Sequence, residues 1–402
     1  MKKILFFLAM SAIVLGMASC ADKNSPTAGK PYKITVHDVT PFGASVQITP
    51  QDKKALYFWV FDEAKKVDAY SSIEEYVYLN KSNYDIVPKY IEQGTVDYVI
   101  PSEESGYQNP RDPNTEYVVI VFTIDEDNEP VLESIVAERF KTLNVVNRAF
   151  SVSDDEQVFF SPGNLYYNAA LKQYFFAENQ WGYIGEFADY TSTKGRYDLF
   201  GWGTGNKPTQ FSTNDKYYTS FSDWGDYPIF NGGNAKNLWR TLSMDEWWYI
   251  GKERYRADEL IGLGTVHDVK GLIILPDGWK QISGVKAFKP AEAAGMDWKT
   301  NGEYKDENLS NDHFTDNVFS DQEWEKMEES GALFLPAVGY RDDTEVGDPG
   351  TYGNYWCNNE NLPDDPTYAR DLYFQQHRIG LLGGMPRHLG ASVRLVWSRP
   401  QR

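Results

Sequence analysis

The stretch "RTLSMDEWWYIG", residues 240–251, places two carboxylates directly against three aromatic side chains. Ser243 followed three positions later by Glu246 is the pattern of a capping box, in which the two residues satisfy each other's backbone N–H groups. Leu242, before the cap, and Trp247, at the fourth helical position, match the contact called a hydrophobic staple. We therefore predict that this stretch begins a helix whose rings face a core, and that its carboxylates are structural.

The same arrangement recurs at "FSDQEW", residues 319–324. Ser320 takes the capping position there, and Glu323 closes the box. Each predicted helix is followed by an apolar run that contains Leu-Pro, "GLIILPDGW" from Gly271 and "GALFLPAVGY" from Gly331. Two matched helix–strand units indicate a scaffold for the second half of the chain.

Three segments of this half carry a resemblance to a known family: "WRTLSMDEWWYI" at 239–250, "GNYW" at 353–356 and "GASVRLVWS" at 390–398. They resemble formylglycine-generating-enzyme-like domains of the C-type-lectin-like superfamily, and in particular the lectin-fold domains of exported bacterial lipoproteins. The resemblance covers about residues 155–398, and we assign the domain to 148–400. It implies an α+β fold, with a small twisted antiparallel sheet, two flanking helices and long loops gathered on one side.

The residues of this domain argue against a catalytic function. The enzyme of that superfamily binds copper through two cysteines, whereas Cys357 is the only cysteine here after Cys20, so the thiol pair cannot form. The histidines show neither zinc-ligand spacing nor a pairing with a nucleophile motif. We assign no catalytic residue, no metal ligand and no cofactor. The stretch "ENLPDD" at 360–365 has the letters, but not the order, of the loop with which lectins of this fold bind sugar through calcium, so calcium-bridged sugar binding stays an open alternative. Paired carboxylates arise by chance in so acidic a chain, which leaves a glycosidase as the least favoured alternative.

Residues 31–143 read as short strands, such as "KITVHDVTPFGASVQITP" at 33–50 and "EYVVIVFTI" at 116–124. The stretch "RDPNTEYVVIVF", followed by "ERFKT", resembles the later strands of fibronectin type III domains. The resemblance implies an all-β sandwich, in which Tyr117 is the corner tyrosine whose hydroxyl bonds to nearby backbone. The predicted fold class is therefore mixed, with this sandwich preceding the lectin-like domain.

Residues 71–94 depart from the sandwich pattern. Ser72 with Glu75 forms a further capping box, and Gly94 is a plausible helix stop. The apolar residues that follow the cap recur at helical spacing: Ile73, Tyr76 and Val77. We expect a helical insertion within the sandwich.

The first residues have the composition of an export signal. Two lysines precede an apolar run at 4–16, which is too short to span a bilayer comfortably, and Met-Ala-Ser-Cys at 17–20 resembles a lipoprotein lipobox. We predict a signal peptide at 1–20, acylation of Cys20 and a flexible tether at 21–30. The protein would then be lipid-anchored to the outer membrane, facing the cell surface or the periplasm. A plain secretory signal is the alternative.

Charge excludes one class of partner. The formal net charge is −19, and no basic stripe interleaves with the aromatic residues. Neutralisation of phosphates by Lys and Arg dominates nucleic-acid affinity, so we expect no nucleic-acid partner.

The best candidate surface lies between residues 356 and 388. In "ARDLYFQQHRIG" at 369–380, strand alternation points Leu372 and Phe374 inward and the intervening side chains outward. The resemblance places the ligand face of lectin-fold proteins in this region. The predicted ligand-binding residues are Trp356, Asn358, Asn359, Tyr373, Gln375, His377, Arg387 and His388.

Rings, amides and a guanidinium can stack on and hydrogen-bond a sugar or a protein surface. We therefore expect a non-catalytic binding module whose ligand is a glycan or a protein. The first alternative is a structural or adhesive protein, fimbrial or diversified by a retroelement, and the second is an enzyme on the lectin scaffold. The structural interpretation of the same residues is that Trp356 belongs to the core and the others are solvated loop positions.

Overall fold

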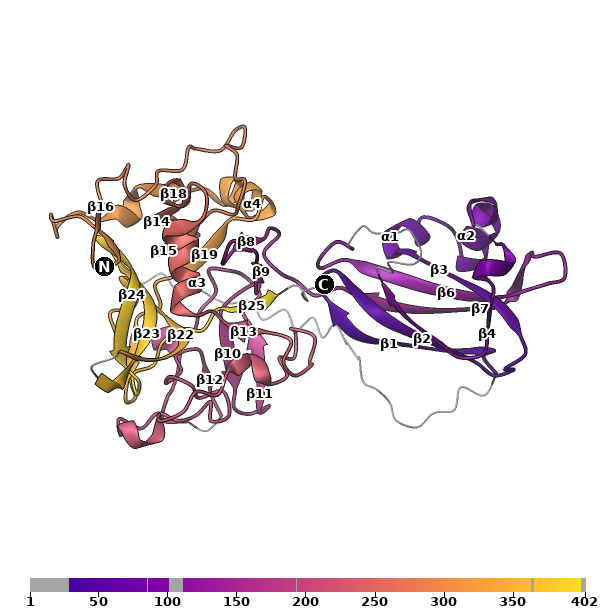
Figure 1. Ribbon diagram of the computed structural model, residues 1–402, viewed down its shortest axis with the longest axis horizontal. Helices are drawn as coiled ribbons and strands as arrows, with labels where there is room; N and C mark the ends of the chain where they lie inside the picture. The colour runs from indigo at the N-terminus through magenta and orange to yellow at the C-terminus, as the bar shows by residue number, and fades with distance from the viewer. Residues whose placement is uncertain (1–28, 85, 101–110, 193, 363–364, 399–402) are drawn as a thin grey trace, which may run out of the picture.

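The computed structural model describes residues 29–84, 86–100, 111–192, 194–362 and 365–398. It is mostly β-sheet, with several antiparallel sheets and few helices, in two bodies that lie side by side (Figure 1). The predicted signal peptide, with Cys20, and all but the last two residues of the predicted tether lie outside the described residues.

The described residues of the N-terminal body form two sheets, with strand orders β1-β2-β5 and β4-β3-β6-β7. Its strands are β1 Tyr32–Thr40, β2 Gly43–Pro50, β3 Leu56–Glu63, β4 Glu92–Gln93, β5 Val96–Ile100, β6 Glu116–Ile124 and β7 Pro130–Lys141. The long apolar run of β6 is explained by burial on both faces, since Val119 and Val121 face the other sheet while Val118, Ile120 and Phe122 face the helices.

The predicted helical insertion is present, but it ends earlier than expected. Helices α1 Ala64–Val67 and α2 Ile73–Asn80 pack on β6 and β7, and two 3₁₀ turns follow at Lys81–Asn83 and Pro88–Tyr90. Ser72 caps α2 by accepting a hydrogen bond from Glu75 N (3.1 Å), but the predicted box is not closed, because the Glu75 carboxylate accepts from the backbone N–H of Ser71 (2.7 Å) and not from that of Ser72. Gly94 does not end the helix. It lies in the turn between β4 and β5 with φ +78°, because the chain re-enters the sheet there.

Tyr117 makes the predicted bond. Its hydroxyl accepts a hydrogen bond from the backbone N–H of Asp112 (3.0 Å), five residues earlier.

The C-terminal body contains five sheets, with strand orders β13-β25-β9-β8, β11-β10-β12, β18-β14-β15-β19, β16-β17-β24-β23-β22 and β20-β21, counted over the described residues. Its first strands are β8 Phe150–Ser151, β9 Gln157–Phe160, β10 Leu165–Asn168, β11 Gln173–Phe176, β12 Arg196–Tyr197, β13 Arg240–Thr241, β14 Ile261–Val266, β15 Val269–Ile274 and β16 Asp297–Lys299. The later strands are β17 Glu303–Lys305, β18 Asn317–Phe319, β19 Leu333–Pro336, β20 Tyr340–Asp342, β21 Glu345–Gly347, β22 Tyr352–Leu362, β23 Asp365–Gln375, β24 Arg378–Pro386 and β25 Leu395–Ser398.

Helices are short in this body. They are α3 Met244–Trp248, continued by a π-helical turn Tyr249–Glu253, and α4 Asp321–Glu329. Further 3₁₀ turns occupy Gly185–Phe187, Asp215–Tyr217, Trp224–Asp226, Ala257–Glu259 and His313–Thr315.

The two capping boxes predicted for this body are confirmed. In α3, Ser243 Oγ accepts from Glu246 N (3.2 Å) and Glu246 Oε2 accepts from Ser243 N (2.6 Å). Ser320 and Glu323 exchange the same two bonds at α4. Trp247 is buried in the main core, so the opening stretch is a helix start with an inward ring, as predicted.

The two Leu-Pro runs that follow the helices lie next to each other. Strand β15 pairs antiparallel with β19, with Gly271 opposite Pro336 and Ile274 opposite Leu333. The matched units of the sequence therefore meet in one sheet.

The joint between the two bodies is packed. Leu143 and Val145 belong to a core cluster of the C-terminal body, and Leu143 N donates to Thr40 O (3.1 Å). Phe42, in the turn between β1 and β2, lies 4.6 Å from Phe159 and 5.4 Å from Trp397 between ring centroids. Apolar contacts as well as the covalent chain thus hold the bodies together.

Candidate ligand-binding face

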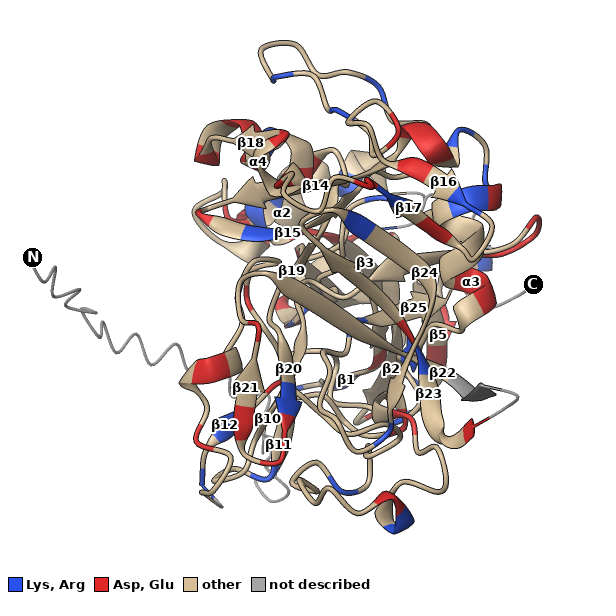
Figure 2. Ribbon diagram, turned by 90° about the vertical axis from the view of Figure 1, so that its left-hand side faces the viewer, with Lys and Arg blue, Asp and Glu red and all other residues tan. Residues whose placement is uncertain are grey.

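Neighbouring strands of the five-stranded sheet, whose ribbons are labelled in Figures 1 and 2, bring together a set of buried and half-buried polar and aromatic side chains. The register places Tyr352 of β22 opposite Gln375 of β23, and Gln375 opposite Arg378 of β24. Directly paired residues point to the same side of a sheet, so these side chains share one face. We call this set the polar face, defined by Glu303, Tyr352, Tyr373, Gln375 and Arg378.

Tyr373 is the centre of the polar face. Its hydroxyl donates to Glu303 Oε2 (2.8 Å), and its ring centroid lies 6.2 Å from that of Tyr352. The guanidinium carbon of Arg378 lies 5.5 Å from the Tyr373 ring centroid. Gly380 is needed opposite, because a Cβ there would come within 2.1 Å of the Tyr373 ring. The glycine thus lets the tyrosine lie across the neighbouring strand.

A shallow hollow adjoins these residues. Asp348, Thr351, Tyr352, Gln375 and Gln376 line a volume of about 310 Å³. With its amide oriented to satisfy its neighbours, Gln375 accepts hydrogen bonds from Nε and Nη2 of Arg378 (both 2.8 Å). The hollow therefore presents hydrogen-bonding groups that are already held in place.

The charges of the polar face are fixed at neutral pH. Burial acts to raise the pKa of Glu303, but hydrogen bonds from Asn301 and Tyr373 and the charge of Arg378 outweigh it, so the pKa is lowered. Burial, together with Glu303, raises the pKa of Tyr373. The face thus contains an ionised carboxylate, a neutral phenol and a guanidinium, and the buried carboxylate of Glu303 (5% exposed) serves to hold the Tyr373 hydroxyl.

Two buried polar side chains lie deeper on the same face. Asn354 is 1% exposed and Asp371 is 2% exposed. Within the described part of the chain, neither amide atom of Asn354 nor Oδ1 of Asp371 has a hydrogen-bond partner. Burial raises the pKa of Asp371 to about 7.

The prediction that Trp356 reaches the ligand face is wrong. Its side chain is 1% exposed, and its indole N–H donates to Phe200 O (2.6 Å). The ring belongs to the core cluster that contains Trp202 and Trp224. The alternative interpretation of this residue as a core tryptophan is the one that holds, because a long loop covers this end of β22.

His377 and Arg387 are also buried, contrary to prediction. Strand β23 ends at Gln375, so alternation no longer applies at His377, which is 9% exposed and accepts a backbone bond from Asp306 N (2.9 Å). Burial lowers the pKa of His377, and the nearby cations add to the effect. Arg387 donates to Tyr368 O (3.0 Å) and Tyr218 O (3.2 Å). Its guanidinium therefore holds the backbone of neighbouring segments in place and is not available to a ligand.

The other predicted residues lie apart from one another. Asn358 donates to Thr241 O (3.2 Å) on β13, and His388 Nδ1 lies 2.8 Å from the Asp215 carboxylate on a 3₁₀ turn. Asn359 falls within β22, but its side chain is outside the described part of the structure. Of the eight predicted residues, the structure brings Tyr373 and Gln375 together.

Three members of the polar face were missed. Tyr352 stands immediately before "GNYW", and Arg378 closes the turn after β23, so both lay beside recognised segments. Glu303 lies some seventy residues away from Tyr373 (|i−j| = 70). Its place at the site depends on the pairing of β17 with β24, for which the sequence contained no signal.

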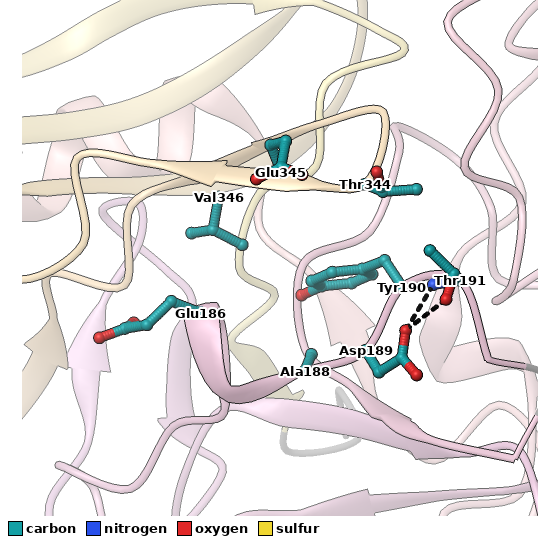
Figure 3. Close-up of a pocket in the computed structure, with 8 residues that line it drawn as sticks. All are labelled: Glu186, Ala188, Asp189, Tyr190, Thr191, Thr344, Glu345 and Val346. Carbon is teal, nitrogen blue, oxygen red and sulfur yellow. Dashed lines mark hydrogen bonds between the residues drawn. The ribbon is translucent and has the colours of Figure 1, made fainter.

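A second hollow, of about 330 Å³, lies elsewhere in the same body (Figure 3). Its lining residues are Glu186, Ala188, Asp189, Tyr190, Thr191, Thr344, Glu345 and Val346. Asp189 accepts hydrogen bonds from the backbone N–H and the hydroxyl of Thr191 (3.0 and 2.6 Å). No group of three or more His, Cys, Asp or Glu side chains among the described residues is placed to hold a metal ion.

Comparison with known proteins finds no family model and no curated protein that matches this chain. Among the residues that the structure describes, no helix is both long and apolar enough to cross a bilayer.

Proposed function

We propose that the protein is a non-catalytic binding lipoprotein that holds a glycan on the polar face. The observation that carries this proposal is the gathering of Tyr373, Gln375 and Arg378 with Glu303 on one half-buried sheet face. The amide of Gln375 and the guanidinium of Arg378 can hydrogen-bond to sugar hydroxyls, while the buried carboxylate of Glu303 holds Tyr373 in position. The tyrosine rings suit the apolar side of a sugar.

Features of both bodies support the finer architecture in this proposal. In the N-terminal body, a three-stranded sheet faces a four-stranded one, and Tyr117 bonds to backbone near the start of its strand, as in a fibronectin type III sandwich. In the C-terminal body, two capped helices and long loops accompany small antiparallel sheets, as expected of a lectin-like domain. We propose that the first is a spacer and the second the binding head, attached to the outer membrane through Cys20.

A structural or adhesive role is the second candidate, and one observation favours it. The helical insertion of the N-terminal body exposes Tyr78 and Leu79 to about half of their surface (54% and 55%). Exposed apolar side chains next to each other suit contact with another protein. An enzyme on the lectin scaffold is the third candidate, and turnover of a polysaccharide by the purified protein would favour it.

The test of the glycan proposal uses the full chain on a printed glycan array, followed by titration with the glycan that binds best. We expect Gln375→Ala and Arg378→Ala each to weaken binding about tenfold, which corresponds to about 1.4 kcal/mol. Gln51→Ala, at an exposed glutamine in the N-terminal body, is the matched control and should bind like wild type. An array without a bound glycan, or two polar-face variants that bind normally, would contradict the proposal.

A further inference from the structure

The sheet β11-β10-β12 has an inner and an outer face with different roles. Strand alternation turns Leu165, Tyr174 and Phe176 into the core, where each is buried. The same alternation turns Tyr166 of β10 and Phe175 of β11 outward as a directly opposed pair. The outer face is therefore not needed to form the core.

Three aromatic rings lie in contact on this outer face, and we call them the aromatic platform: Tyr166, Phe175 and Phe230. The first two are stacked, with ring centroids 5.3 Å apart and planes inclined by 13°. Phe230 adjoins Phe175 at 5.2 Å and is 48% exposed. Single exposed apolar residues are common, but a row of rings in mutual contact outside the core is not.

Polar side chains border the platform on the same face. Asn168 is paired with Gln173 across β10 and β11, and with Arg196 across β10 and β12. The register therefore puts Arg196 on the same face as the rings, and its charge opposes the rise that burial causes in the pKa of Tyr166. The rings are thus flanked by two amides and a cation.

We propose that the aromatic platform is a second binding surface, which stacks on the sugar rings of an uncharged polysaccharide. Aromatic faces pack against the C–H side of a sugar, while amides and a guanidinium at the border reach its hydroxyls. The platform lies on a different sheet from the polar face, and it does not depend on that face being a glycan site (Figure 2).

The size and charge of the surface disfavour other partners. An aromatic side chain buries roughly 150–250 Å² when fully covered, so three partly buried rings offer less than the roughly 800 Å² per partner of a stable protein interface. The net charge of −19 opposes adsorption to an anionic lipid surface. A polysaccharide needs only a few ring contacts repeated along its length.

The test is affinity electrophoresis of the full chain in native gels that contain xylan, mannan or amylopectin. We expect at least one polysaccharide to retard the wild type. Phe175→Ala and Phe230→Ala should each weaken that retardation at least tenfold without lowering the melting temperature. The control is Tyr255→Ala, because Tyr255 is an isolated aromatic residue that is 88% exposed. It should migrate like wild type.

The outcomes separate this proposal from the proposed function. Loss of retardation in Phe175→Ala and Phe230→Ala, with binding kept in Arg378→Ala, supports the platform whatever the polar face does. Loss in Arg378→Ala with normal retardation of both platform variants overturns the platform and leaves the polar face intact. Absence of retardation by all three polysaccharides also overturns it, as does a change in self-association of the platform variants without a change in polysaccharide binding.

Discussion

Asp371 is the residue whose environment departs furthest from that of an ordinary carboxyl group. It is buried on the five-stranded sheet, and burial raises its pKa from 3.8 to about 7. In the unfolded chain the group ionises near pH 4, whereas in the folded chain it stays protonated up to about pH 7. The folded state therefore binds more protons in this window, and the contribution of Asp371 to the free energy of unfolding falls as the pH rises from about 4 to 7.

Asp371→Asn removes this titration. We expect the variant to be more stable than wild type at pH 8, because the folded protein no longer buries a charge, and to differ less from it at pH 5. Melting temperatures at half-unit pH intervals measure the effect. Asp342→Asn, at an exposed position, serves as the control and should keep the wild-type profile. Identical pH profiles for Asp371→Asn and wild type would show that the carboxyl does not titrate in this range.

At the scale of elements, the two capping boxes share a pattern but differ in their surroundings. Glu246 forms an ion pair with Arg240, with Nη2–Oε1 at 2.6 Å and Nη1–Oε2 at 2.9 Å, in addition to its bond from Ser243. Glu323 receives instead a bond from Lys286 N (2.9 Å) at the surface. The same motif thus caps both helices, but only at α3 does its glutamate also form a partly buried ion pair.

We expect Ser243→Ala and Ser320→Ala each to cost about 0.5–2 kcal/mol, since each leaves a helix N–H unsatisfied. Glu246→Gln should cost about 1–3 kcal/mol, because the ion pair with Arg240 is lost. Glu323→Gln should cost less than about 1 kcal/mol, because its bonds are exposed. Chemical denaturation of the four variants measures these differences. Equal costs for Glu246→Gln and Glu323→Gln would mean that the pair with Arg240 contributes nothing.

These elements also show how far the sequence could predict the structure. The capping boxes were predictable because every bond joins residues three positions apart. The outward direction of Tyr373 and Gln375 was predictable because alternation holds along β23. The prediction that the side chain of His377 points outward failed, because the strand stops two residues before it. The prediction that Trp356 and Arg387 face a ligand failed as well. The backbone groups that they bond to, at Phe200 and Tyr218, lie more than 150 residues away in the chain.

On the scale of the whole molecule, lipid attachment would set where the protein works. We expect cells grown with labelled palmitate to incorporate label into the wild type, because the lipobox-like segment places Cys20 at the cleavage point. Cys20→Ala should remain unlabelled and be released in soluble form. Equal labelling of both proteins would place any acyl group elsewhere, and an unlabelled wild type would support the plain secretory signal.

The contact of Phe42 with Phe159 and Trp397 bears on whether the two bodies are interchangeable parts. A flexible linker would let either body be exchanged or expressed alone, as in a string of independent modules. Here, cutting the chain before Leu143 would uncover aromatic surface on both fragments, and each fragment would then tend to self-associate. Substitutions on either side of this contact are therefore coupled, and a β-domain transplanted from another protein would fit the C-terminal body only if it brought its own aromatic residue to the turn after its first strand.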